Sequence, residues 1–190
     1  ISKTIVVGAS PTVSYTINNA AQCLRGNSFT FTSTSTVSTG TITNAWNYGD
    51  GGTGAVSPAT RSYAAAGTYK VLLTATSGGC VDTLSKYVKV YPQATRNIAF
   101  NTQRQCLKTN NFVFTNTSTV ASPGNMMKWA WDWGDTKTDT AKSPTHVYTT
   151  AGTYKVILTI TSANSCTDTI SKTIVVIPNA TLGLAINNAS

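Results

Sequence analysis

The stretch WAWDWGDT, residues 129–136, concentrates the residue types of this chain that are most able to do chemistry. It holds three of the four tryptophans at alternate positions, and two of the six acidic residues, all of which are aspartates. A row of tryptophans provides a platform for sugar rings, and aspartates are ligands for Ca²⁺. The same spacing also fits the buried face of a strand, because alternate side chains point to one side.

Other chemistry is scarce in the sequence. His146 is the only histidine, and the four cysteines include no C-x-x-C pair, so the ligands of a cysteine–histidine metal site are missing. No nucleophile triad and no carboxylate pair recurs along the chain. We therefore expect a protein that is not an enzyme and that carries no cofactor.

The strongest pattern is an internal repeat, which indicates two copies of one domain. The matching pairs are NSFTFTSTSTV (27–37) and NNFVFTNTSTV (110–120), AWNYGD (45–50) and AWDWGD (130–135), AGTYKVLLT (66–74) and AGTYKVILT (151–159), and CVDTLSK (80–86) and CTDTISK (166–172). We expect the first domain over residues 8–91 and the second over residues 92–178.

The two ends of the sequence repeat as well. ISKTIVV at 1–7 is identical to 170–176, and INNA at 17–20 recurs at 186–189. We therefore expect residues 1–7 to be the last strand of a preceding repeat, and residues 179–190 to be the start of a following one. Strand addition to a neighbouring molecule would hold residues 1–7, and the alternative is an extended segment that lies on its own domain.

Composition predicts an all-β protein. Charged residues make up 11% of the chain, and β-branched and aromatic residues are common. The net charge of +8 comes from scattered lysines and arginines without a basic run, which argues against nucleic acid as a partner. Acidic surface glycans fit that charge, but a solvated surface with few acids is the favoured explanation. No apolar stretch is long enough to span a membrane.

Alternating segments separated by turns predict several short strands in each copy. In the first copy these segments are TVSYTIN, SFTFTST, TNAWNYG, GTYKVLLTATS and VDTLSKYVKV. About seven such strands in ~85 residues predict an Ig-like Greek-key β-sandwich. The expected fold is thus two tandem sandwiches within a longer array.

WNYGDGG and WDWGDT resemble the W-D-F-G-D-G motif of PKD (polycystic kidney disease) domains. SPTHVYTTAGTYKVILTI resembles the second signature of that family, and both motifs occur twice in order. The cysteine positions resemble the PKD repeats of Bacteroidota surface proteins, which include the adhesins of gliding bacteria. Departures from the motif are Asn47, Tyr48, Arg61 in place of His146, and Thr136, and they argue against a catalytic role at these positions.

Four cysteines, two in each copy, indicate an oxidising, extracellular compartment. The default expectation pairs Cys23 with Cys80 and Cys106 with Cys166. In a Greek-key sandwich, however, these positions lie at opposite poles, too far apart for a disulfide. The alternative is a bond from Cys23 to Cys166, with the remaining cysteines paired to copies elsewhere.

Comparison of the copies assigns most of the WAWDWGDT stretch to the fold. We expect core and turn roles for the motif residues, which are Trp46, Tyr48, Asp50, Trp131, Trp133, Asp135, Tyr69 and Tyr154. Trp129 has no aromatic counterpart and is the candidate glycan contact. Asp132, Asp135 and Asp139 are weak Ca²⁺ candidates, since the first copy keeps only Asp50 of this set.

Three Asp-Thr segments resemble the O-glycosylation acceptor of Bacteroidota, with Thr83, Thr140 and Thr169 as the candidate sites. The function that we expect from the sequence is a stalk or spacer in a cell-surface adhesin or filament, with neighbouring copies of the repeat as partners. Two alternatives stay open. One is a carbohydrate-binding module that contacts surface glycans, and the other is an accessory domain of a secreted hydrolase.

Overall fold

A computed structural model of the chain describes residues 8–121 and 127–181. The chain divides into two compact units, Ile1–Pro92 and Gln93–Ser190. The predicted strands at 1–7 and beyond residue 181 lie outside the described residues, as does the strand addition expected of residues 1–7. In the described part of the chain, no helix is long and apolar enough to cross a membrane.

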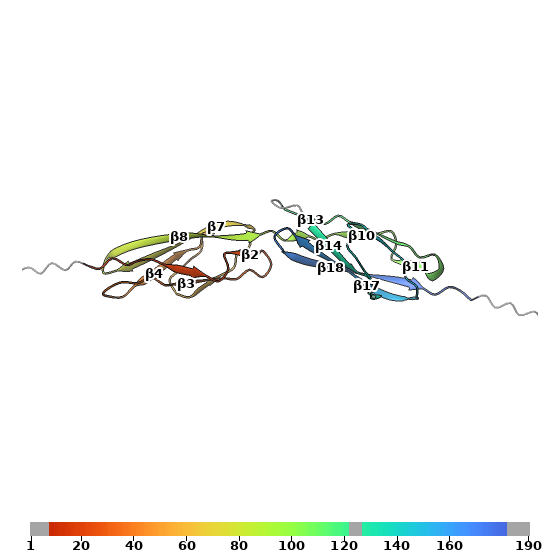
Figure 1. Cartoon of the computed structure of the whole chain (residues 1–190), viewed down its shortest axis with the longest axis horizontal. Coiled ribbons are helices and arrows are strands. Elements are labelled where there is room, and N and C mark those ends of the chain that lie inside the picture. Colours follow the sequence, from red (N-terminus) through yellow and green to blue (C-terminus); the bar gives the residue numbers. More distant parts are fainter. Residues whose placement is uncertain (1–7, 122–126, 182–190) are drawn as a thin grey trace, which may run out of the picture. The chain divides into compact units, whose positions relative to one another are not determined.

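The first unit is a sandwich of two sheets, drawn in red to yellow-green in Figure 1. A three-stranded sheet has the order β1-β3-β6, and a five-stranded sheet has the order β2-β8-β7-β4-β5. The strands are β1 (Tyr15–Ile17), β2 (Ala21–Cys23), β3 (Phe29–Ser33), β4 (Thr43–Asn47), β5 (Thr53–Gly54), β6 (Ala59–Arg61), β7 (Gly67–Ser77) and β8 (Cys80–Tyr91).

The second unit repeats this plan, with sheets β10-β12-β16 and β11-β18-β17-β14-β15 and a short β13-β9 pair. Its elements are β9 (Ala94–Thr95), β10 (Ile98–Phe100), β11 (Arg104–Cys106), η1 (Leu107–Thr109), β12 (Phe112–Asn116), β13 (Thr119–Val120), β14 (Met127–Asp132), β15 (Thr138–Asp139), β16 (Thr145–His146), β17 (Gly152–Ser162) and β18 (Thr167–Ile177). The predicted all-β, Ig-like fold in two tandem domains is confirmed.

Side-chain alternation explains why these segments form a sandwich. Along β3, Phe29 and Phe31 are fully buried while the threonine between them is only partly covered. β7 buries every second residue from Val71 onward, so one face joins the core and the other is more exposed. Each unit has its own aromatic core, and in the first unit Tyr15 meets Trp46 edge to face at 5.0 Å.

The sequence predicted one strand before β3, at residues 12–18, and the structure has two, since β1 lies within that range and β2 follows it in a segment that was expected to be a loop. β1 pairs antiparallel with β3, and the chain then crosses to the other sheet, where β2 pairs parallel with β8. Asn18 and Asn19 make the crossing, and each side chain accepts a backbone N–H bond near its own position. β11 repeats the parallel pairing with β18 in the second unit. In each unit, the strand of the larger sheet that comes first along the chain therefore lies directly beside the strand that comes last.

Candidate functional site

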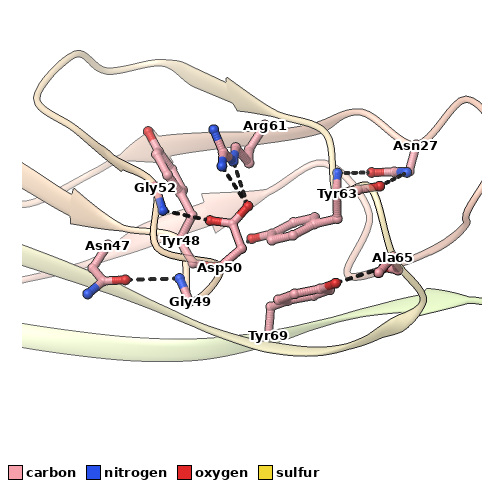
Figure 2. A network of polar contacts seen from close by, with 10 residues as sticks. All are labelled: Asn27, Asn47, Tyr48, Gly49, Asp50, Gly52, Arg61, Tyr63, Ala65 and Tyr69. Carbon is pink, nitrogen blue, oxygen red and sulfur yellow. Dashed lines mark hydrogen bonds and ion pairs between the residues drawn. The ribbon is translucent and has the colours of Figure 1, made fainter.

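The motif turn of the first unit is a closed polar network (Figure 2). Asp50 Oδ1 accepts the Gly52 backbone N–H at 3.0 Å, which fixes the turn between β4 and β5. Its other oxygen accepts two bonds from Arg61, at 2.9 Å from Nε and 2.7 Å from Nη2. Asn47 Oδ1 accepts the Gly49 N–H. The carboxylate therefore joins its own turn to β6 of the opposite sheet.

The second unit builds the same turn with a different partner. Asp135 accepts the Lys137 backbone N–H at 3.2 Å and contacts His146 Nε2 at 2.9 Å. The His146 ring stacks on Trp133 at 4.6 Å with an interplanar angle of 4°. The only histidine of the chain is thus committed to the core and to the turn.

Both turn carboxylates have lowered pKa values. Burial raises the pKa of Asp50, but the hydrogen bonds from Arg61 and Gly52 outweigh it and hold the pKa below its ordinary value. For Asp135, burial is likewise outweighed by the His146 contact and the Lys137 N–H, so its pKa is also lowered. The two side chains therefore stay ionised, as acceptors, well into the acid range.

A second anchor ties the chain before β7 to the chain before β3. The Asn27 amide donates to the carbonyls of Leu24 and Tyr63 and accepts the Tyr63 N–H at 2.7 Å (Figure 2). The Tyr63 hydroxyl in turn donates to the Tyr48 carbonyl at 2.8 Å. Burial is the main reason that the pKa of Tyr63 is raised, so this hydroxyl remains a donor.

The second unit contains the same anchor, formed by Asn110 and Tyr148. Sequence reasoning missed both asparagines, although each is the first residue of a repeated segment, NSFTF or NNFVF. It also missed the contacts of the two turn carboxylates with Arg61 and His146. The signal for them was the constant spacing of eleven residues from Asp50 to Arg61 and from Asp135 to His146.

The glycine of the motif is required by its backbone. Gly49 has φ of 78° and Gly134 has φ of 75°, a region that side chains disfavour. A Cβ at Gly49 would lie 2.6 Å from the Lys70 carbonyl oxygen on β7. The motif thus packs one turn directly against the backbone of a neighbouring strand.

The motif aromatics belong to the core. Trp46, Tyr48, Trp131 and Trp133 are all buried. The first aromatic residue of each motif, Trp46 or Trp131, also has a partner for its indole N–H. Trp46 donates to the Val56 carbonyl, and Trp131 donates to the Ala141 carbonyl.

The tyrosines at the start of the long strands cover the anchors. Tyr69 stacks on Tyr63 at 4.0 Å between ring centroids, and Tyr154 stacks on Tyr148 at 3.9 Å. Each also donates its hydroxyl proton to a nearby backbone carbonyl. Both tyrosines are therefore part of the fold.

Trp129 is half-buried and packs against the core of the second unit. Its indole nitrogen is buried without a hydrogen-bond partner among the described residues. Trp129 lines a hollow of about 500 Å³ together with Met127, Lys128, Ala130, Thr140 and Thr161. Among the described residues that line this hollow, Lys128 is the one charged side chain and none is a carboxylate.

The weak Ca²⁺ candidates do not converge. Asp132 accepts the Gly134 N–H at 2.9 Å, and Asp139 accepts the Ala141 N–H at 2.7 Å, so each carboxylate serves its own turn. Among residues 8–121 and 127–181, no group of three or more His, Cys, Asp or Glu side chains is placed to hold a metal ion. The three candidate O-glycosylation residues, Thr83, Thr140 and Thr169, are all exposed.

The structure contradicts pairing of the cysteines within each copy. Cys23 and Cys166 are disulfide-bonded, whereas Cys80 and Cys106 carry free thiols. The physical reason is distance, because Cys23 lies beside Tyr91 at the far end of β8 from Cys80. The alternative bond from Cys23 to Cys166 stays a prediction.

Comparisons with known proteins identify the family of the two units. The family model described as "PKD domain" matches residues 8–90 and 94–177. The pre-pro-metalloprotease PrtV of Vibrio cholerae is 45% identical over 60 residues, a match that spans 31% of this chain and 6% of that protein. The crystal structure of the PKD1 domain from that metalloprotease is 34% identical, with a TM-score of 0.38, and the match covers 45% of this chain and 96% of that domain.

A more distant likeness concerns the fold alone. The N-terminal eight Ig domains of Down Syndrome Cell Adhesion Molecule match with a TM-score of 0.52 at 13% identity, over 91% of this chain and 25% of that one. The family match covers most of the chain and falls on the two units separately. The chain therefore belongs to the PKD domain family and carries two such domains in tandem.

Proposed function

We propose that this chain is a non-catalytic, load-bearing repeat of an extracellular protein, and that it acts as a stalk or spacer in a cell-surface adhesin. The cysteine positions, which resemble those of Bacteroidota surface repeats, support this kind of parent protein. The motif residues support a non-catalytic role, because Asp50, Arg61, Asp135 and His146 are engaged in fixing turns.

The observation that carries the proposal is the parallel pairing of β2 with β8. Lys89 N–H donates to the Ala20 carbonyl and Leu24 N–H donates to the Tyr91 carbonyl, each at 2.8 Å. Tension along the chain pulls β2 backward through its amino end and β8 forward through its carboxyl end. The two strands are then sheared along their length, and the hydrogen bonds between them are loaded together rather than one after another.

The second unit has the same arrangement. β11 runs parallel to β18, and Val175 N–H donates to the Gln103 carbonyl at 2.9 Å. Each domain therefore resists extension by itself, as a spacer under load requires. Because the pairing recurs, we expect two mechanical unfolding events of similar strength from this chain.

Single-molecule force spectroscopy in a reducing buffer tests the proposal with Leu24→Pro and its matched control Leu24→Ala. Both variants lose the same partly buried side chain, but only proline removes the N–H that bonds Tyr91. We expect Leu24→Pro to lower one of the two unfolding forces clearly below that of Leu24→Ala, with the second force unchanged. Equal forces in the two variants would show that this strand pair bears no load.

The relation to a Vibrio metalloprotease favours a second candidate, an accessory domain of a secreted hydrolase. The sequence of the full gene distinguishes the two candidate functions. A catalytic domain beside the PKD repeats would support the accessory role, and further repeats with a surface anchor would support the stalk.

A further inference from the structure

The two cysteines of each domain lie at opposite ends of one long strand. Cys23 is the register partner of Tyr91, the last residue of β8, and Cys80 is the first residue of that strand. At about 3.3 Å per residue the two positions are roughly 36 Å apart. A disulfide needs Cα atoms within about 7 Å, so no bond forms within the domain.

The second domain repeats this placement. Cys106 is the register partner of Ile177, the last residue of β18, and Cys166 immediately precedes Thr167, the first residue. Cys106 is thus equivalent to Cys23, and Cys166 is equivalent to Cys80. We call the first pair the exit cysteines (Cys23 and Cys106) and the second pair the entry cysteines (Cys80 and Cys166).

These names describe where the chain leaves and enters each domain. Tyr91, beside the exit cysteine Cys23, is followed by Pro92 at the end of the first unit. At the entry end of the second unit, the Gln93 side chain donates to the Thr167 carbonyl at 2.5 Å, next to Cys166. At the entry end of the first, the Cys80 thiol contacts the Gly8 carbonyl at 3.6 Å.

The redox states of the cysteines differ between equivalent positions. The exit cysteine is disulfide-bonded at Cys23 and a free thiol at Cys106. The entry cysteine is disulfide-bonded at Cys166 and a free thiol at Cys80. The exit position and the entry position therefore each form a disulfide in one of the two domains. Neither free thiol lies in a core, since Cys106 is exposed and Cys80 is half-buried.

We propose that Cys106 of one chain forms a disulfide with Cys80 of a second copy of the chain, so that PKD domains are joined end to end by exit-to-entry bonds. The proposal goes beyond the load-bearing function, because it names the partner and the covalent chemistry that joins it. Its test measures connectivity rather than force, so the two proposals fail on different measurements.

The bond requires an oxidant, for which a small disulfide such as oxidised glutathione suffices. The Cys106 thiolate attacks one sulfur of that disulfide, forms a mixed disulfide and releases one small thiol. The Cys80 thiolate of the second chain then attacks the Cys106 sulfur, forms the protein disulfide and releases the second small thiol. The two protons of the protein thiols leave with the two small thiols.

Complementary variants test the pairing, with Cys80→Ser and Cys106→Ser incubated in a glutathione redox buffer alone and as a mixture. The mixture can form the Cys106–Cys80 bond once per pair of chains, whereas each variant alone can form only a symmetric bond. On non-reducing gels we expect reductant-sensitive dimers in the mixture, at least tenfold more than in either variant alone. The native chain should form a ladder of multimers.

Trypsin separates the four cysteines into peptides 4–25, 71–86, 105–108 and 156–172. We expect mass spectrometry of the oxidised native chain to show 71–86 linked to 105–108. Monomers only, equal dimers in all three samples, or a link from 4–25 to 71–86 would each overturn the proposal. Circular dichroism of both variants checks that the serines leave the fold intact, as expected for positions outside the core.

Discussion

Asp50 accepts two hydrogen bonds from the guanidinium of Arg61, and Asp135 meets His146 in the same place of the second domain. The partner side chain differs, but its role is unchanged: it holds the motif turn against the opposite sheet. Comparison of the two domains thus shows that arginine and histidine can fill the same structural role at this position.

Acid should weaken both domains through these carboxylates. Their folded pKa values are lowered below the ordinary value of about 4, so the folded state binds fewer protons than the unfolded state near that pH. The stabilisation is fully present above about pH 5 and is lost as the pH falls through the folded pKa values. Urea unfolding at pH 6 and pH 3 measures it.

The double variant Asp50→Asn with Asp135→Asn is the control for that experiment. We expect it to be less stable than the native chain at pH 6 and to lose less stability on acidification. The same loss between pH 6 and pH 3 in both proteins would assign the acid sensitivity to other groups.

Replacing Asn110 by alanine should destabilise the second domain by about 3 kcal/mol, since two buried backbone groups of Tyr148 and the part-buried carbonyl of Leu107 lose their partners. Thermal or urea unfolding measures this change. Asn111→Ala is the matched control, because the side chain of Asn111 is exposed, and it should stay within about 0.5 kcal/mol of the native protein. Comparable losses in both variants would refute the anchor.

Thr136→Gly should stabilise the second domain by up to about 1 kcal/mol. Thr136 has φ of 74°, a conformation unfavourable for a β-branched residue, and the equivalent residue of the first domain is Gly51 with φ of 86°. The reverse change, Gly51→Thr, should destabilise the first domain although nothing lies within 4 Å of the added Cβ. Melting temperatures that move in the opposite directions would show that backbone strain at Thr136 does not lower the stability of the second domain.

Trp129→Ala tests the carbohydrate-binding alternative. Because Trp129 packs partly against the core, we expect the variant to lose about 2 kcal/mol of stability and to match the native chain on a glycan array. Glycan binding by the native chain that disappears in a folded Trp129→Ala protein would instead establish the hollow as a sugar site.

The sequence determined the fold class and the two domains, because alternation and the repeated motifs are local signals. It also separated the motif tryptophans from Trp129, since one copy serves as a control for the other. The Asp50–Arg61 and Asn27–Tyr63 contacts were not predicted, because the repeated positions mark these residues as equivalent in the two copies without saying which partners they meet; the pairs are 11 and 36 residues apart and meet only in the packed sheets.

The additional strand β2, which follows the strand predicted over residues 12–18, was likewise decided by tertiary structure. Alternation fixes which face of a strand is buried, but not which of two sheets the strand joins. The crossing at Asn18 and Asn19 puts β2 parallel to β8 and Cys23 beside Tyr91. The sequence therefore settled which segments form strands, and the packing of the sheets decided which strands lie side by side and where along them the cysteines lie.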